Sequence, residues 1–463
     1  MEAWISQFVS AVNDVLWNKQ LLLLFLLLGT GIYFTVRTRF VQVRQFPEGM
    51  RRLFGSINIH GDKAGHEGMS SCQALTTAIA AQVGTGNITG CATALVSGGP
   101  GAIFWMWVSA FFGMATIYGE AILAQISRTR NSEGQITGGP IYYIRAAFKG
   151  RLGKFLAGFF SISIILALGL MGNIVQSNSI GVAFANAFSF PELLTGVLVA
   201  GIAAFIFVGG VHRIASFTEK MVPIMACFYI AGCVILLGLN WRALPGALQS
   251  IFVCAFQPQA VMGGALGIGV KEAMRFGVAR GLFSNEAGMG STPHAHALAK
   301  VEKPQDQGVI AMMGVFIDTF VVLTLTALVI LTSGLLEPGA EGALTGTALA
   351  QAAFCKTLGR FGNIFLALCM LFFAFSTIIG WYFFGETNVK ALFHDSKLAR
   401  NIYALLVVGC IVLGSVQKVN LVWDASDMFN GLMVIPNLLA VLVLGRVVFK
   451  AARGEKVSAD DLK

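Results

Sequence analysis

The chain has 463 residues, of which 56% are hydrophobic and 12% are charged, with a mean hydropathy of +0.74 and a net charge of +9. Soluble proteins carry about 25% charged residues, so this composition excludes an ordinary soluble enzyme and predicts a polytopic membrane protein. The positive charge does not indicate nucleic-acid binding, because the basic residues are spread between apolar segments rather than gathered in one patch.

Apolar windows of about 19 residues predict about eleven membrane-spanning helices, and therefore an all-α fold. The predicted spans lie near 20–36, 72–96, 99–127, 155–187, 192–210, 217–238, 262–290, 307–333, 362–388, 401–417 and 425–449. The preceding segment, Met1–Lys19, has apolar residues at helical spacing and lacks the pattern of a cleaved signal peptide. We expect it to form an amphipathic lead-in helix.

The loops between the spans alternate in charge. Basic residues are concentrated in the linkers 37–68 and 128–154 and in the segment after the last span, whereas the opposite loops hold few of them. The positive-inside rule therefore predicts that the N-terminus lies outside and the C-terminus lies in the cytoplasm.

The second span contains Gln82-Val83-Gly84-Thr85-Gly86-Asn87 near its middle. Two glycines there weaken a helix, and unwound backbone at membrane depth is tolerated only where protein or a water-filled cavity satisfies its polar groups. A helix broken at this depth can offer carbonyls to a cation and N–H groups to an anion, as in secondary transporters. The alternative is a glycine-rich face that packs closely on a neighbouring helix.

Two carboxylates lie inside predicted spans, Glu120 in the third and Asp318 in the eighth. A buried carboxylate needs a partner, which here could be the free N–H groups of a broken helix. Either residue could also be a proton-binding site. In the fourth span Asn173, Gln176 and Ser177 share one helical face, where they could bind a substrate or a neighbouring helix.

The seventh span predicts a second break. It contains several glycines and charged residues, namely Gly263, Gly264, Gly267, Gly269, Gly277, Gly281, Lys271, Glu272, Arg275, Arg280 and Glu286. Charge at membrane depth usually faces a cavity or pairs, and we expect the unwound part within Phe276–Phe283. The alternative is a short span followed by a cytoplasmic loop that carries the charges.

The two interrupted spans each open a block of five, which is typical of inverted repeats with a binding site near the bilayer midplane. The predicted organisation is an N-terminal segment with an extra helix at 1–36, a basic cytoplasmic linker at 37–68, repeats at 69–240 and 241–450, and a cytoplasmic tail at 451–463.

The ninth span carries adjacent hydroxyls at Ser376 and Thr377. With carbonyls of the first broken helix they could form a mostly neutral oxygen cage for a small hard cation. The alternative is hydrogen bonding to the carbonyl four residues earlier, which is common in membrane helices. Trp381, one turn later, could wall off a small pocket.

Other polar residues are expected to be unremarkable. His60, Asp62, His66 and Glu67 are expected in a solvated loop, as are His294 and His296, and Asp424 and Asp427 are expected to cap the last helix. The chain has no Walker loop and no catalytic Ser/His/Asp arrangement, so we expect neither direct ATP coupling nor an enzyme.

Three runs resemble the alanine-or-glycine:cation symporters. They are Ala81-Gln82-Val83-Gly84-Thr85-Gly86-Asn87-Ile88, Gly277-Val278-Ala279-Arg280-Gly281-Leu282-Phe283-Ser284-Asn285-Glu286-Ala287-Gly288 and Ser376-Thr377-Ile378-Ile379-Gly380-Trp381-Tyr382. The resemblance extends from about residue 20 to 450. It implies the amino acid–polyamine–organocation superfamily and the five-plus-five inverted-repeat fold of the leucine transporter, with two broken helices and one extra N-terminal helix.

The resemblance also implies residue roles. The amino acid would contact Thr85, Gly86, Asn87, Gln176 and Trp381, with Phe276, Gly277 and Gly281 as candidates from the seventh span. Sodium would be held by carbonyls near Gln82 and Val83, the Phe373 carbonyl and the hydroxyls of Ser376 and Thr377. Glu120 would brace the broken helices, and Gly84, Arg280 and Glu286 would have structural or coupling roles.

The function implied is sodium-coupled import of alanine or glycine across a bacterial inner membrane by alternating access, without an organic cofactor. One alternative is proton coupling through Glu120 or Asp318. Another is a channel or sensor that binds an amino acid without concentrating it.

Overall fold

The computed structural model describes residues 2–55, 68–131, 134–257, 269–338, 342–417 and 420–462. Within these ranges the chain is almost entirely helical, and its only paired strands form one small antiparallel hairpin of β1 (Thr129–Arg130) and β2 (Ile136–Thr137). The all-α fold predicted from composition is confirmed.

The first half of the chain supplies the helices up to α13. They are α1 (Glu2–Asn13), η1 (Asp14–Asn18), α2 (Leu22–Arg37), α3 (Val41–Arg44), α4 (Phe46–Gly55), α5 (Ser71–Gln82), η2 (Gly86–Gly90), α6 (Cys91–Gly98), α7 (Gly101–Ser127), α8 (Pro140–Ala147), α9 (Gly150–Ile164), η3 (Ile165–Gly172), α10 (Asn173–Phe188), α11 (Glu192–Val208), α12 (Gly210–Leu239), η4 (Trp241–Ala243) and α13 (Leu244–Phe256).

The second half supplies the rest. They are α15 (Val270–Asn285), α16 (Pro293–Leu298), α17 (Pro304–Val315), η5 (Phe316–Leu323), α18 (Thr324–Ser333), α19 (Gly346–Leu358), α20 (Arg360–Leu392), α21 (Lys397–Gly414), α22 (Asn420–Val443), α23 (Gly445–Ala452) and η6 (Ala459–Leu462). Of the short segments, η1, η2, η3 and η5 are π-helical turns within or beside longer helices.

Among the described residues, eight helices are long and apolar enough to cross a membrane, and α11 is a shorter apolar helix. The two interrupted spans consist of shorter pieces, α5–η2–α6 and α15–α16. The architecture is therefore that of a multi-pass membrane protein, while the count of eleven spans and the boundaries of the two repeats stay predictions.

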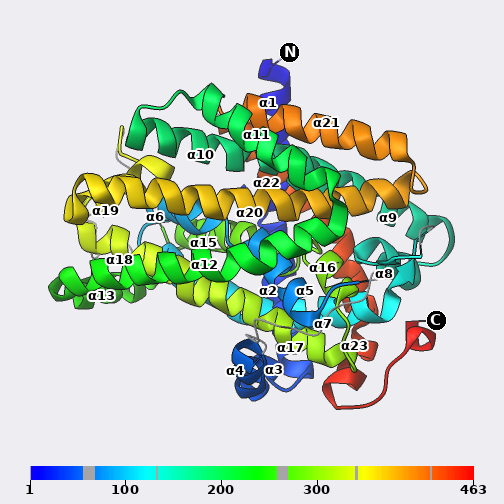
Figure 1. The fold of residues 1–463 in the computed structure, drawn as a ribbon. Helices are drawn as coiled ribbons and strands as arrows, with labels where there is room; N and C mark the ends of the chain where they lie inside the picture. The colour runs from blue at the N-terminus through cyan, green and yellow to red at the C-terminus, as the bar shows by residue number, and fades with distance from the viewer. Residues whose placement is uncertain are drawn as a thin grey trace.

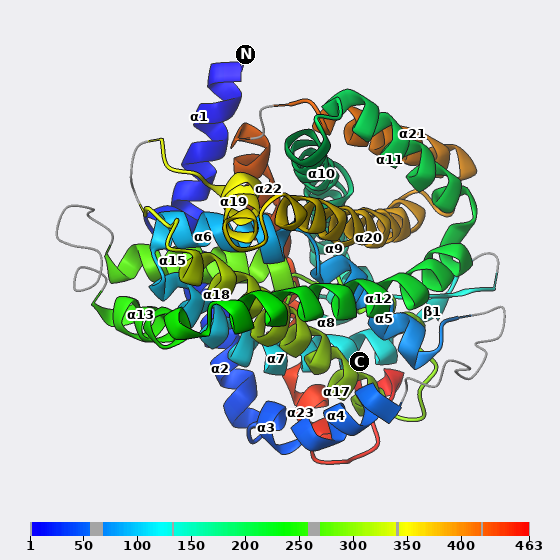
Figure 2. The same cartoon turned by 60° about the vertical axis from the view of Figure 1, so that its left-hand side comes forward.

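Helix α20 lies in the centre of the molecule. Figures 1 and 2 show α20 crossing the middle, with α10, α11 and α21 on one side and α12 on the other. It packs on α5, α10, α12, α19 and α21. Every residue from Phe373 to Val389, about half of the helix, is buried, because partner helices surround this part.

The first predicted break is present at the position expected from the sequence. Helix α5 begins with a capping box, in which Ser70 and Gln73 satisfy each other's backbone N–H groups, and ends at Gln82. Val83 leaves the helical conformation at φ −81° and ψ 88°, and the chain turns helical again at Gly86. The glycines therefore interrupt the span rather than merely pack against a neighbour.

The second break is present, but its expected position within Phe276–Phe283 is wrong. Helix α15 is continuous to Asn285, and the chain is non-helical from Glu286 to Thr292 before α16 begins. Glycine serves another purpose inside α15: a Cβ on Gly277 would lie 2.5 Å from the Ala102 carbonyl oxygen of α7. Gly277 thus permits close helix packing, and neither it nor Gly281 unwinds the backbone.

Two other expectations are wrong. His294 and His296 are not in a solvated loop, because both are buried in α16 against the rest of the core. Asp424 and Asp427 do not cap the last helix, because α22 already begins at Asn420. The residues His60, Asp62, His66 and Glu67 lie outside the described ranges.

Candidate functional site

The first break is held by side chains close to it. The Gly84 N–H donates to Asn87 Oδ1 over 3.0 Å, and the Thr85 N–H donates to Gln176 Oε1 of α10 over 3.1 Å. Gln82 Nε2 donates to the carbonyl oxygen of Asn285, the last residue of α15, over 2.7 Å. The amides of Gln82 and Gln176 thus connect the break to α15 and to α10.

Five oxygens converge beside this break. The hydroxyl of Thr377 lies 2.9 Å from the Ala80 carbonyl oxygen, 3.0 Å from that of Phe373 and 3.4 Å from that of Val83. The hydroxyl of Ser376 lies 2.9 Å from the Phe373 carbonyl oxygen and 3.4 Å from that of Ala80. Three carbonyls and two hydroxyls, all buried and neutral, make a donor set suited to a small hard cation.

The hydrogen bonds of Thr377 show which α5 carbonyls lie beside it. The α5 carbonyls that face Thr377 belong to Ala80 and Val83, three residues apart, whereas the side chain of Gln82 points to α15. Gly84 completes the arrangement, because a Cβ there would lie 2.3 Å from Thr377 Oγ1. The predicted back-bonding also occurs, since both hydroxyls donate to Phe373.

Several buried polar atoms around the break have no protein partner in the described part of the chain. They are Thr85 Oγ1, Gln176 Nε2 and Gln82 Oε1. A buried polar atom left unpaired costs about 1–3 kcal/mol, so such atoms seldom gather without a ligand to bind. This group includes both a donor and acceptors, and so matches a ligand that itself carries both.

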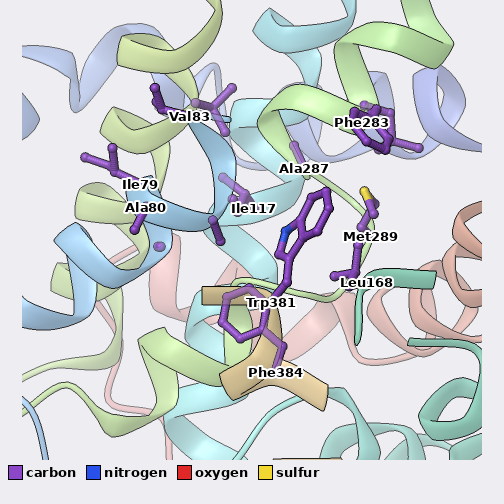
Figure 3. Packing of buried hydrophobic residues seen from close by; sticks show 14 of the residues in the cluster. Ile79, Ala80, Val83, Ile117, Leu168, Phe283, Ala287, Met289, Trp381 and Phe384 are labelled. Atoms are coloured by element: carbon purple, nitrogen blue, oxygen red, sulfur yellow. The ribbon is translucent and has the colours of Figure 1, made fainter. Parts of the chain in front are cut away.

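Trp381 lies between the two breaks. Its indole N–H donates to Glu286 Oε1 over 2.5 Å, and its ring meets Phe283 edge-on at a centroid distance of 5.6 Å. Figure 3 shows the indole extending from α20 toward Ala287 and Met289. Gly172 is required on the other side, because a Cβ there would lie 2.4 Å from the indole ring.

The second break is held by side chains from distant helices. Glu120 of α7 accepts the Gly288 N–H over 3.0 Å and the Asn437 amide of α22 over 2.5 Å, and that amide also donates to the Gly288 carbonyl over 2.9 Å. Glu286, in the left-handed region at φ 58°, accepts from the Ser291 hydroxyl as well as from Trp381. The sequence predicted a role for both carboxylates, whereas nothing in it indicated a role for Asn437.

Asp318 bridges the first break to α15. Its carboxylate accepts from Asn87 Nδ2 at 2.6 Å, from the Ser284 hydroxyl at 2.9 Å and from the Thr319 hydroxyl at 2.8 Å. It is fully buried, and no Lys or Arg of the described residues lies within ion-pair distance of it. The structure thus brings Asn87 to a carboxylate for which the sequence alone indicated no partner.

An ion pair joins α15 to α22. Arg280 contacts Asp427 in bidentate fashion at 2.9 and 2.7 Å, and its guanidinium lies 5.0 Å from the Trp423 ring centroid. Phe283, one turn further along α15, contacts Trp423 at a centroid distance of 5.0 Å. Arg280 is therefore connected through two aromatic rings to the site around Trp381.

Three predicted substrate contacts are not brought to the breaks. Gly277 packs on Ala102, a Cβ on Gly281 would lie 3.6 Å from Met106, and Phe276 lies under the Arg275 guanidinium at 4.1 Å. Their close neighbours belong to α6, α7 and α15 itself, because α15 stays helical through this region.

The three polar residues predicted to share a face of the fourth span have different partners. Gln176 reaches the first break, Asn173 donates to the Gly169 carbonyl of its own helix, and Ser177 donates to the Ile411 carbonyl of α21. The open choice between substrate and interhelical bonding is therefore settled for Ser177 in favour of the neighbouring helix.

The comparisons with known proteins agree with one another. A family model described as "Sodium:alanine symporter family" matches residues 1–456. The "Sodium/alanine symporter AgcS" of Methanococcus maripaludis is 41% identical over 442 residues, covering 95% of each chain. The "Probable sodium/glutamine symporter GlnT" of Bacillus subtilis is 42% identical over 454 residues, covering 98% of this chain and 91% of its own.

Solved structures agree on the fold. MhsT in complex with L-phenylalanine matches with a TM-score of 0.63 at 14% identity, covering 86% of this chain and 95% of its own. A manganese transporter of Eremococcus coleocola matches with a TM-score of 0.52 at 15% identity, covering 86% and 83%. The predicted leucine-transporter type of fold is confirmed.

Proposed function

The chain belongs to the sodium:alanine symporter family, and from that premise we propose that it imports alanine or glycine together with sodium by alternating access. It is a multi-pass membrane transporter. The choice among amino acids is part of the proposal, because one relative is named for alanine and another for glutamine.

The observation that carries the proposal is the cluster of five neutral oxygens beside the first break, in which two hydroxyls lie within hydrogen-bond distance of three carbonyls. Sodium would replace the hydrogen bonds donated there, with the hydroxyls of Ser376 and Thr377 turning their lone pairs toward the ion. The carbonyls of Ala80 and Val83 belong to the broken helix, and that of Phe373 belongs to α20. A bound ion would therefore fix these two elements relative to each other.

The amino acid would bind at the unpaired atoms around Thr85 and Gln176. The helical segment that restarts at Gly86 presents its N-terminus, which favours a carboxylate. Asn87 would position this segment through Asp318, and Trp381 would bound the space for the side chain. Ion and amino acid would thus share the residues of one break, and binding of either would favour binding of the other.

Transport in liposomes tests the proposal. Purified protein is reconstituted, and uptake of labelled alanine, glycine and glutamine is followed with an inward sodium gradient or an equal potassium gradient. We expect alanine or glycine to accumulate above its outside concentration only with sodium. Equilibration without accumulation would instead identify a channel or sensor, and failure of all three substrates would refute the amino-acid assignment.

A proton-coupled symporter is the second candidate, and Asp318 is the observation that favours it. This buried carboxylate contacts both the first break and α15, so its protonation would affect both. An inward proton gradient without sodium should then drive uptake, and Asp318→Asn should abolish the effect. Glu120 serves this role less well, because its two oxygens already hold Gly288 and Asn437.

The orientation is part of the proposal. The distribution of basic loops supports an N-terminus outside and a C-terminus in the cytoplasm, in a bacterial inner membrane. Labelling of single cysteines introduced into α4 and at Gln135 with a membrane-impermeant reagent in intact cells tests this, since both positions should be protected.

A further inference from the structure

A cavity of about 480 Å³ lies between α11, α20 and α21, away from the two breaks. Its lining from α20 consists of Tyr382, Glu386 and Lys390, which repeat every four residues along one face of that helix. Thr377 and Trp381 lie on the opposite face of α20. The cavity is therefore separate from the transport site, although the same helix forms a wall of both.

One end of the cavity is cationic. Lys390 Nζ lies 3.3 Å and Arg400 Nε lies 3.9 Å from the same oxygen of Glu386, so two cations share one carboxylate. The Lys390 and Arg400 side chains keep 20% and 32% of their surface exposed. The excess positive charge and its accessibility favour an anionic group at this end.

The same end also contains an unpaired acceptor. Glu386 is 3% exposed, and its Oε2 has no hydrogen-bond partner among the described residues. A buried carboxylate oxygen without a donor costs free energy, so a ligand that brings a hydroxyl group would be stabilised there. A simple inorganic anion at neutral pH would supply charge for the cations but few donors for this oxygen.

Part of the cavity wall is apolar and exposed. Val208 of α11 and Leu405 of α21 line it, and they are 87% and 73% exposed. The cavity thus combines two cations and a free acceptor with an exposed apolar wall that an acyl chain could cover.

We propose that this cavity binds an anionic phospholipid whose headgroup carries free hydroxyls, of which phosphatidylglycerol is the simplest. The phosphodiester lies between Lys390 and Arg400, a headgroup hydroxyl donates to Glu386 Oε2, and an acyl chain lies along Val208 and Leu405. Basic pockets between membrane helices are known to bind anionic headgroups in this way. The proposal rests on the membrane fold and not on the transported substrate.

The expected consequence is a fixed position for α20. The Tyr382 ring stacks on Phe207 of α11 at 3.6 Å between centroids and on Tyr403 of α21 at 5.4 Å. A lipid beside these rings would connect three helices behind Trp381. Occupancy should therefore raise the thermal stability of the protein.

Native mass spectrometry of the full chain, after addition of defined lipids, tests the proposal. We expect phosphatidylglycerol to be retained in preference to phosphatidylcholine, and Lys390→Gln/Arg400→Gln to weaken this retention about tenfold or more. Arg151→Gln/Lys154→Gln, which removes two exposed charges at the start of α9, is the matched control and should retain the lipid. Equal retention of phosphatidylglycerol by the two double variants would refute the proposed binding site.

Two further measurements separate the elements of the proposal. Phosphatidylmethanol has the same charge but no headgroup hydroxyl, so native protein should prefer phosphatidylglycerol over it, and Glu386→Ala should lose that preference. Equal binding of the two lipids by native protein would refute the role of Glu386. Displacement of the lipid by millimolar inorganic phosphate would show a site for soluble anions instead.

Should the double variant fail to fold, Ala404→Phe fills part of the cavity without changing charge, since Ala404 lines the cavity from α21. Loss of phosphatidylglycerol retention is expected from this variant too. Undiminished retention would overturn the placement of the acyl chain.

Discussion

The two interrupted spans differ in length and in the residues that hold them. The first span is interrupted over Val83–Thr85, and the interruption is held by Asn87 of the same span and by Gln176 of α10. The second span is non-helical from Glu286 to Thr292, and it turns at Gly288 and Gly290 with φ of +91° and +78°. Side chains of α7 and α22 hold this interruption in place.

The difference teaches that a broken helix can be predicted from sequence when its own residues carry the signal, even where distant residues such as Gln176 also hold the break. The first break has its glycines at the point of unwinding, with a polar residue three positions away. The second depends on Glu120, which lies 168 residues before Gly288, and on Asn437, which lies 149 residues after it. Mutations can test whether the two breaks also differ in their contributions to stability and transport.

The largest effect is expected from Glu120→Ala, which acts on the second break. Gly288 N–H and the Asn437 amide would lose their buried acceptor at about 1–3 kcal/mol each, so the free energy of unfolding should fall by several kcal/mol. Thermal unfolding in detergent measures this. Glu455→Ala, at an exposed pair with Arg453, is the control and should leave the melting temperature unchanged. An equal melting temperature for both variants would contradict the bracing role.

The next effect is expected from Gly86→Val in the first break. A Cβ there would lie 3.0 Å from Ser284 Cα and 3.3 Å from the Phe283 ring, and the larger side chain would enter the proposed carboxylate site. Alanine binding should be abolished, as measured by isothermal calorimetry on purified protein. Gly281→Ala is the control, because its Cβ would lie 3.6 Å from Met106, an ordinary contact, and binding should persist. Retained affinity in Gly86→Val would reject the assignment.

A more selective effect is expected from Thr377→Ala. Removing one ligand of the proposed cation costs about 1.5–3 kcal/mol, so the sodium concentration for half-maximal uptake should rise about tenfold or more. Trp381→Ala should change that concentration less, because Trp381 contacts Glu286 and not the oxygen cage. Thr332→Ala, whose hydroxyl bonds to its own helix, is a control for loss of a threonine. Unchanged sodium dependence in Thr377→Ala would exclude this site.

The smallest effect is expected at the ion pair between Arg280 and Asp427, which joins the second interrupted span to α22. A double-mutant cycle of Arg280→Gln and Asp427→Asn should give a coupling energy of about 0.5–3 kcal/mol in thermal unfolding. The same cycle at the exposed pair of Arg453 and Glu455 should give almost none. Additive effects at Arg280 and Asp427 would show that the pair does not hold the helices together.

Much of the fold can be predicted from the sequence. Long apolar segments, alternating loop charge and a glycine pair in mid-span each indicate the environment of the residues that carry them. The position of the second break was not accessible. Gly277 and Gly281 both lie within the continuous helix α15, and at Gly277 α7 approaches too closely for a Cβ, whereas at Gly281 the contact would be ordinary. A glycine that permits packing and a glycine that permits a turn are identical in the sequence.

The candidate site was predicted in part. Ser376, Thr377 and Val83 meet as expected, whereas Ala80 was missed because an alanine contributes only its carbonyl and leaves no chemical signal. Asp427 and Asn437 were missed for a different reason. Their partners lie 147 residues and more away in the chain, and pairing over that separation is decided by the packing of α22.

The π-helical turns η2, η3 and η5 have a consequence for the evolution of this protein. Each adds a residue to a turn, and η2 and η5 carry Asn87 and Asp318. A π-turn accommodates its extra residue locally, so loss of one residue from such a segment would restore an ordinary α-turn while the flanking helices keep their register. A single deletion there would therefore remove or shift a side chain such as Asn87 or Asp318 without moving the helices on either side.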